Sequence, residues 1–62
     1  MKSFYVIEYN YPKNMYEYVA DENGFRTYDP EKALQFKTIK EAAEKILELD
    51  IPDTHIQKMW RG

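Results

Sequence analysis

The sequence contains no cysteine, so neither disulfide bonds nor thiolate metal sites can reinforce the fold. The two glycines, Gly24 and Gly62, are too few and too far apart for a phosphate-binding loop. No apolar run approaches the roughly 20 residues of a membrane-spanning helix, and Glu8 interrupts the N-terminal stretch before signal-peptide length. These absences predict a soluble, cytoplasmic protein that is stabilised by packing.

Side chains that carry out catalysis are also scarce. His55 is the only histidine and Ser3 the only serine, so no set of nucleophile, base and orienting group can be assembled. One histidine without cysteine does not favour a transition-metal site, and the acidic residues do not match a calcium loop. We therefore expect no enzyme activity, no metal and no cofactor. His55, close to Asp53, is expected to be a surface or hydrogen-bonded residue.

Length and charge narrow the class of protein further. The 62 residues predict a single domain, residues 1–62, which buries only about 60% of its unfolded surface. Such a chain relies on packing, with oligomerisation as a further source of stability. Nine basic and eleven acidic residues give a net charge of −2, which argues against a broad electrostatic contact with nucleic acid.

Aromatic and β-branched residues dominate the first half of the chain and predict three strands. Residues 3–11 form the first, and Pro12 begins the break before a second strand at residues 15–20. Asn23-Gly24 is a strong signal for a type I′ hairpin turn, because both residues accept positive φ. A short third strand follows at residues 25–28.

One helix is predicted in the second half. Asp29–Glu31 favours a single helical turn, with an extended piece near residues 35–37. Thr38 and Glu41 match a capping box, from which a helix runs to about Leu49. The apolar stripe of this helix is predicted to contain Ile39, Ala42, Ala43, Ile46 and Leu47.

The final strand completes the expected architecture. Pro52 prevents continuation of the helix, and residues 54–60 alternate as a strand does. The helix would also supply the crossover that a parallel pairing of this strand needs. The sequence thus predicts an α+β fold in the order ββ(β)αβ, a small antiparallel sheet with one helix packed on one face.

The register of the first hairpin has two alternatives. A four-residue loop would pair Tyr9 with Tyr16 and gather the tyrosines on one face, but would set Glu8 opposite Glu17. A loop of odd length avoids the contact between glutamates and splits the tyrosines between faces. We prefer the four-residue loop. It places Tyr5, Ile7 and Tyr18 under the helix and leaves Phe4, Val6, Met15 and Val19 on an open face.

An aromatic group near the first turn is the candidate binding surface. The helix is not expected to reach this region, which contains Tyr9, Tyr11 and Tyr16. Three roles are open for these tyrosines: core packing, base stacking and protein binding. Trp60 either closes the core or anchors an interface, and Arg26 supplies a polar contact. These five residues are the predicted partner-binding set. A homodimer would also cover an exposed face.

Base stacking is the alternative function. Aromatic side chains on an open sheet, with Arg26, Lys13 or Arg61 at its edges, are used by several small modules to hold single strands. The net charge and the lack of an RNA-binding signature disfavour nucleic acid, while a nucleotide between tyrosines needs less positive charge.

The stretches FYVIEYN and ALQFKTIKEAAEKI resemble many small uncharacterised proteins of bacteriophages and prophages. In those proteins a hairpin precedes an A-x-x-F-x-[ST]-x-x-E-A segment, which here consists of Ala33, Phe36, Thr38, Glu41 and Ala42. The resemblance implies an accessory protein of the host cytoplasm that binds and inhibits or modulates a host protein. Our first hypothesis is accordingly a non-enzymatic protein-binding module.

Overall fold

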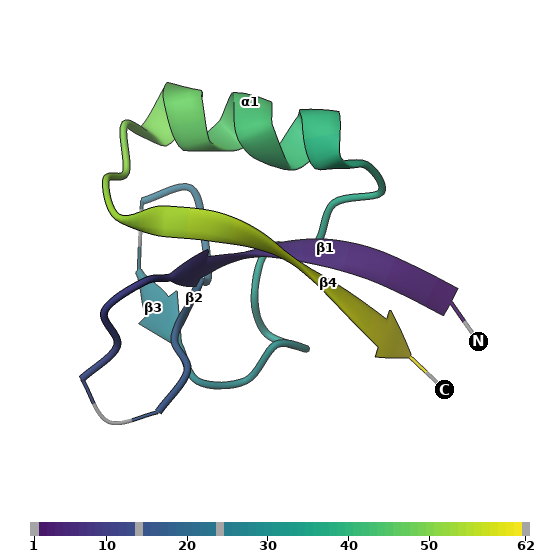
Figure 1. Ribbon diagram of the computed structural model, residues 1–62, viewed down its shortest axis with the longest axis horizontal. Helices are drawn as coiled ribbons and strands as arrows, with labels where there is room; N and C mark the ends of the chain where they lie inside the picture. The colour runs from purple at the N-terminus through teal and green to yellow at the C-terminus, as the bar shows by residue number, and fades with distance from the viewer. Residues whose placement is uncertain (1, 14, 24, 62) are drawn as a thin grey trace.

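The structure is a computed structural model that describes residues 2–13, 15–23 and 25–61. Along the chain lie β1 (Lys2–Tyr9), β2 (Tyr18–Val19), β3 (Arg26–Thr27), α1 (Ile39–Leu49) and β4 (Thr54–Arg61). The strands form one antiparallel sheet in the order β3-β2-β1-β4, with α1 packed on one face (Figure 1). The predicted α+β fold is confirmed. Within these residues, α1 is too short and too polar to cross a membrane.

The first and last strands pair along their whole length. β1 and β4 are antiparallel, from Lys2 opposite Arg61 to Tyr9 opposite Thr54, so Lys2 and Arg61 lie side by side (Figure 1). The parallel alternative for the last strand is therefore wrong. On the other edge of β1, Tyr5 and Phe36 exchange two backbone hydrogen bonds of 2.9 Å. This bridge confirms the predicted extended piece at residues 35–37.

The hairpin of β1 and β2 has the register that we did not prefer. Glu8 lies opposite Tyr18, and the backbone N–H of Tyr9 donates to the carbonyl of Glu17 at 2.9 Å. The loop is therefore of odd length, and Tyr9 and Tyr18 lie on opposite faces. This register separates the two glutamates, because Glu8 gains Tyr18 as its neighbour and Glu17 gains Arg26 at 3.1 Å.

The turn between β2 and β3 is longer than predicted. The N–H of Ala20 donates to the carbonyl of Phe25 at 2.6 Å, so four residues separate the paired positions. A two-residue turn at Asn23-Gly24 is thus wrong, although Gly24 itself lies outside the described residues. The Asp21 carboxylate orders this loop by accepting the backbone N–H groups of Asn23 at 2.8 Å and Phe25 at 3.3 Å.

Helix α1 begins and ends close to where the sequence predicts. The Thr38 hydroxyl accepts the N–H of Glu41 at 3.1 Å, while the Glu41 carboxylate accepts the N–H of Lys37 at 3.2 Å instead of that of Thr38. At the other end Asp50 adopts a left-handed conformation with φ of 52°, and its N–H closes the last turn. Leu49 is the last helical residue, as expected.

The helix is rotated relative to the predicted apolar stripe. Ala42 is fully buried against the sheet, and Ile46 and Leu49 pack beside it. Ile39 and Leu47, which the stripe included, are 57% and 80% exposed. Because alanine lets the helix approach the sheet closely at Ala42, the sheet-facing side of α1 is centred there.

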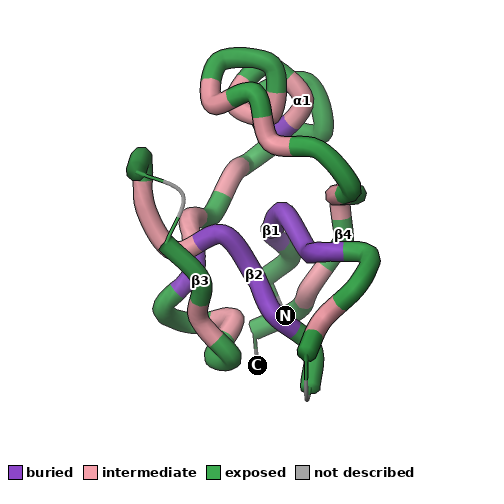
Figure 2. The backbone as a smooth tube through the Cα atoms, turned by 90° about the vertical axis from the view of Figure 1, so that its left-hand side faces the viewer, coloured by how far each residue is buried: buried purple, intermediate pink, exposed green. Residues whose placement is uncertain are grey.

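Both faces of the sheet are covered, and the buried residues gather on β1 and β2 (Figure 2). The helix face packs Ile7, Tyr9, Val19 and Ala42 together, with seven partly buried neighbours. The opposite face is not open as predicted, since Phe4 and Val6 are buried with Tyr18, Ala33 and Met59. Tyr18 and Val19 have thus exchanged the faces that were expected of them, and Met15 stays exposed.

The segment between β3 and α1 provides this second cover. Backbone hydrogen bonds from Lys32 to Asp29 and from Ala33 to Pro30 confirm the predicted turn after Asp29. Arg61 of β4 then fixes the segment to the sheet, because its Nη2 donates to Glu31 at 2.8 Å and to Gln35 at 2.7 Å. A lone helix therefore need not cover the whole sheet.

Candidate functional site

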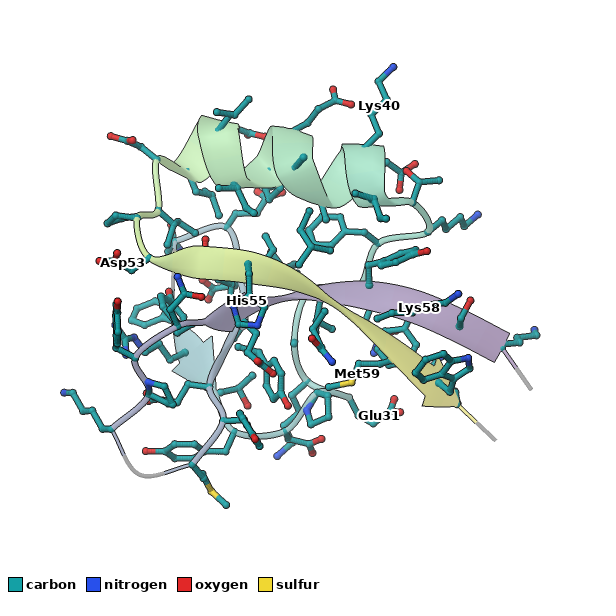
Figure 3. All side chains as sticks on the ribbon, in the orientation of Figure 1. Glu31, Lys40, Asp53, His55, Lys58 and Met59 are labelled. Carbon is teal, nitrogen blue, oxygen red and sulfur yellow. The ribbon has the colours of Figure 1, made fainter. Side chains whose placement is uncertain are left out.

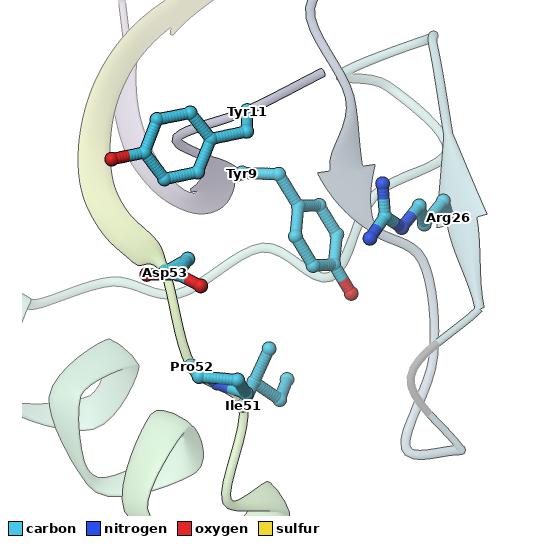
Figure 4. Close-up of a pocket in the computed structure, with 6 residues that line it drawn as sticks. All are labelled: Tyr9, Tyr11, Arg26, Ile51, Pro52 and Asp53. Atoms are coloured by element: carbon cyan, nitrogen blue, oxygen red, sulfur yellow. The ribbon is translucent and has the colours of Figure 1, made fainter. Parts of the chain in front are cut away.

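Three of the five predicted partner-binding residues meet at one pocket of about 390 Å³ (Figure 4). The pocket lies where the end of β1, the start of β3 and the turn between α1 and β4 come together. It is lined by Tyr9, Tyr11, Arg26, Ile51, Pro52 and Asp53. Because these residues come from three separate segments, only the complete fold creates the site.

Arg26 is fixed in place by two contacts. Its guanidinium carbon lies 4.0 Å from the centre of the Tyr9 ring, and its Nη1 donates to the Glu17 carboxylate at 3.1 Å. Glu17 is only 4% exposed and also accepts the backbone N–H of Lys13 at 3.0 Å. A cation held by a ring and a carboxylate presents a preorganised hydrogen-bonding surface to the pocket.

The two tyrosines have different roles in the pocket. Tyr9 is 8% exposed, so it is a core residue whose ring forms a wall, and the expectation of an exposed anchor is wrong for it. Tyr11 is 77% exposed and stands at the rim. The strand ends between these two residues, which explains why the first side chain is held by the core and the second projects outward.

The far wall of the pocket comes from the turn after the helix. Asp53 has a positive φ of 57°, and its carbonyl accepts the N–H of Asn10 at 2.8 Å. This bond continues the ladder of β1 and β4 and brings Pro52 and Asp53 beside Tyr11. Sequence reasoning missed this wall because it depends on the antiparallel pairing of the first and last strands.

The electrostatics of the pocket are mixed. Arg26 and Asp53 lie on either side of Tyr9, so one cation and one anion flank an aromatic and aliphatic floor (Figure 4). A polyanion would meet the Asp53 carboxylate as well as the Arg26 guanidinium. The lining is better matched to a ligand that is largely apolar and carries one or two polar groups.

The other two predicted residues lie elsewhere. Tyr16 is 68% exposed and close to Tyr18, whose pKa is raised by burial first, then by the charges of Glu8 and Tyr16. Trp60 is 59% exposed and pairs with Ser3, at the end of β4 remote from Asp53. A core role for Trp60 is therefore wrong. The five residues do not form one surface.

His55 takes part in a polar cluster on the face away from α1 (Figure 3). Its Nε2 lies 2.8 Å from the carboxylate of Glu8, which is buried within β1, and its Nδ1 contacts the side chain of Asn10. The neighbour of Glu8 across the sheet is Tyr18. This cluster supplies hydrogen bonds to the buried Glu8 carboxylate. The only sequence signal for it is Glu8 itself, because a glutamate inside an apolar strand needs a polar partner.

Comparison with family models, with curated proteins and with solved structures gives no significant match. The case for a function therefore comes from the geometry and chemistry of the chain itself.

Proposed function

We propose that this chain is a non-enzymatic protein-binding module whose pocket receives a side chain of its partner. The observation that carries the proposal is Tyr11, a largely exposed ring at the rim of a pocket that is also lined by Tyr9 and Arg26, which contact each other. Aromatic and arginine side chains around a concave site are the usual centres of binding energy in protein interfaces. The resemblance to phage and prophage accessory proteins supports a host protein as the partner, inhibited or modulated by occupation of its surface.

Because the pocket is preorganised, a partner can bind tightly through a small contact area. Arg26 already has its ring and carboxylate partners in the free protein, so binding does not have to order it. The rotamer of Tyr11 is the main freedom that a partner would restrict. Tyrosine loses little conformational entropy on binding for the area it covers, which makes it an efficient anchor.

A nucleotide or single-stranded nucleic acid remains the second candidate, favoured by the exposed Tyr11 ring beside Arg26. The Asp53 carboxylate in the same pocket and the net charge of −2 count against it. The two candidates differ in the molecule that Tyr11 contacts, so one experiment distinguishes them.

The experiment replaces Tyr11 with a photoreactive phenylalanine analogue and irradiates the protein in cells of the host. Tyr28 is 51% exposed and does not line the pocket, so the same replacement at Tyr28 is the matched control. We expect one protein to be crosslinked from position 11 and not from position 28. Crosslinks to nucleic acid alone would support the second candidate instead.

The identified partner is then tested with purified proteins. Tyr11→Ala is expected to weaken binding at least tenfold, as a central aromatic anchor does, while Tyr28→Ala leaves the affinity unchanged. Circular dichroism of both variants checks that the fold is retained. Equal affinities for the two alanine variants would contradict the proposed role of the pocket.

A further inference from the structure

We propose that the outer edge of β4 is a self-association surface, on which a second copy of this chain pairs to form one continuous eight-stranded antiparallel sheet. β4 is an edge strand of eight residues, Thr54–Arg61, and in the described parts of the chain only β1 pairs with it. It carries no proline. A long unprotected edge is a template for pairing with another strand, which natural proteins usually cover.

The hydrogen bonds fix which backbone groups face outward. The N–H of Asn10 donates to the carbonyl of Asp53, so Asp53 and every second residue after it point their backbone groups at β1. The bridge of Tyr5 to Phe36 on the opposite edge of β1 agrees with this alternation. The backbone groups directed away from the sheet are those of Thr54, Ile56, Lys58 and Trp60.

Symmetry then selects the register. Antiparallel pairing of two identical edges has a two-fold axis perpendicular to the sheet, so residues on the same face must oppose each other. An axis at Gln57 sets Ile56 opposite Lys58 of the second copy and Thr54 opposite Trp60. All four outward residues are then paired, and each copy donates four backbone hydrogen bonds. An axis at Lys58 would instead place the two Lys58 ammonium groups opposite each other.

The helix presents an apolar strip on the same side. Ile39, Ala43 and Leu47 are spaced by four residues and form one ridge, of which Ile39 and Leu47 are well exposed. Lys45 lies on the other flank of α1, where it reaches Glu22 in the loop between β2 and β3 at 3.6 Å. The strip therefore faces away from β3, toward the edge that β4 forms in Figure 2.

The spacing of the two helices fits this arrangement. α1 packs over β1 and β4, so two strand spacings of about 4.8 Å separate the helix axes across the dimer, about 10 Å in all. Helices in contact are about 8–10 Å apart. We place the two-fold axis beside Ala43, the middle of the strip, which sets Ala43 against Ala43 of the second copy and Ile39 against Leu47. The small central residue allows the approach, and the large residues fill the ends.

The two-fold symmetry limits the association to two copies. Lys58 lies on the helix face, with its ammonium near the rings of Tyr5 and Trp60. In the two-fold register it lies opposite Ile56 and no second cation. Because the two-fold contact uses the β4 edge of both copies, no β4 edge is left for a third copy, and the product is a closed dimer.

The test measures molecular mass by sedimentation over protein concentrations from the micromolar to the millimolar range. We expect a concentration-dependent dimer and, because Trp60 is the only tryptophan, a parallel blue shift of its emission. Lys58→Pro removes an outward N–H without removing a bond to β1, so it should fold and remain monomeric. Lys58→Ala keeps the N–H and should dimerise.

A second pair of variants tests the helix strip and guards against misfolding of the proline variant. Leu47→Glu places a charge on the strip and should raise the dissociation constant at least tenfold. Asn23→Glu adds the same charge at the exposed loop between β2 and β3 and should not. Wild-type protein that is monomeric at every concentration overturns the proposal, as does a dimer that Leu47→Glu leaves intact. Tyr11→Ala should dimerise normally, which separates this surface from the pocket.

Discussion

Two buried glutamates constrain the register of the first hairpin. Glu8 within β1 and Glu17 just before β2 are 8% and 4% exposed, and each needs a partner to offset the loss of water. Glu8 finds His55 on β4, while Glu17 finds Arg26 at the start of β3. The hairpin register that supplies both partners is the one the chain adopts.

The pair of Arg26 and Glu17 predicts a measurable coupling. Arg26→Ala should lower the free energy of unfolding by about 2 kcal/mol, because it leaves the Glu17 carboxylate buried without its cation. Adding Glu17→Gln should recover part of that loss, since the amide removes the charge and still accepts the N–H of Lys13. Urea unfolding of both variants at neutral pH is the measurement. A double variant no more stable than Arg26→Ala would show that the charge is not the cause.

Tyr18 gives the fold a dependence on alkaline pH. Burial, followed by the charge of Glu8, raises the pKa of the phenol above its ordinary value of 10.0, so the folded state favours the neutral form. The resulting contribution to stability is fully present below pH 10. It is lost as the pH rises through the folded-state pKa, because the unfolded chain ionises first. Tyr18→Phe should therefore lose less stability than the wild type between pH 9 and 11 in urea unfolding. The exposed Tyr11→Phe is the control, and equal losses for all three proteins would refute the assignment.

At the level of elements, α1 was predictable and the short strands were not. The helix bounds follow from local signals, namely the cap at Thr38 and the break before Pro52. β2 and β3 have only two residues each, and their limits are set by pairing with distant residues. The choice between odd and even hairpin loops likewise required knowledge that Arg26 would lie beside Glu17, which no local pattern contains.

The N-cap of α1 provides a prediction for this element. Thr38→Ala removes the hydroxyl that accepts the N–H of Glu41 and should destabilise the protein by about 1 kcal/mol. Thr38→Ser keeps the acceptor and should stay close to the wild type. Thermal unfolding followed by circular dichroism at 222 nm measures both. A serine variant as unstable as the alanine variant would assign the effect to the lost methyl group instead.

For the whole molecule, sequence patterns predicted the layers but not how they close. The antiparallel sheet and its helix were expected, whereas the cover of the second face came from the segment after β3, which has no strong periodicity of its own. The pocket likewise combines residues that the sequence identified with residues that only the tertiary fold brings together. Tyr11 and Arg26 were identified as surface candidates from composition, but Ile51, Pro52 and Asp53 join them only because the chain returns antiparallel to β1.

The antiparallel pairing of β4 with β1 has a consequence for folding during protein synthesis. β1 finds its longest partner in residues 54–61, and a nascent chain lacks that partner until those residues have emerged from the exit tunnel. Products that stop before Thr54 would display Val6 and Ile7 along an unprotected strand, a ready target for chaperones and proteases. We therefore expect chains truncated before Thr54 to be degraded faster than chains that include the final strand.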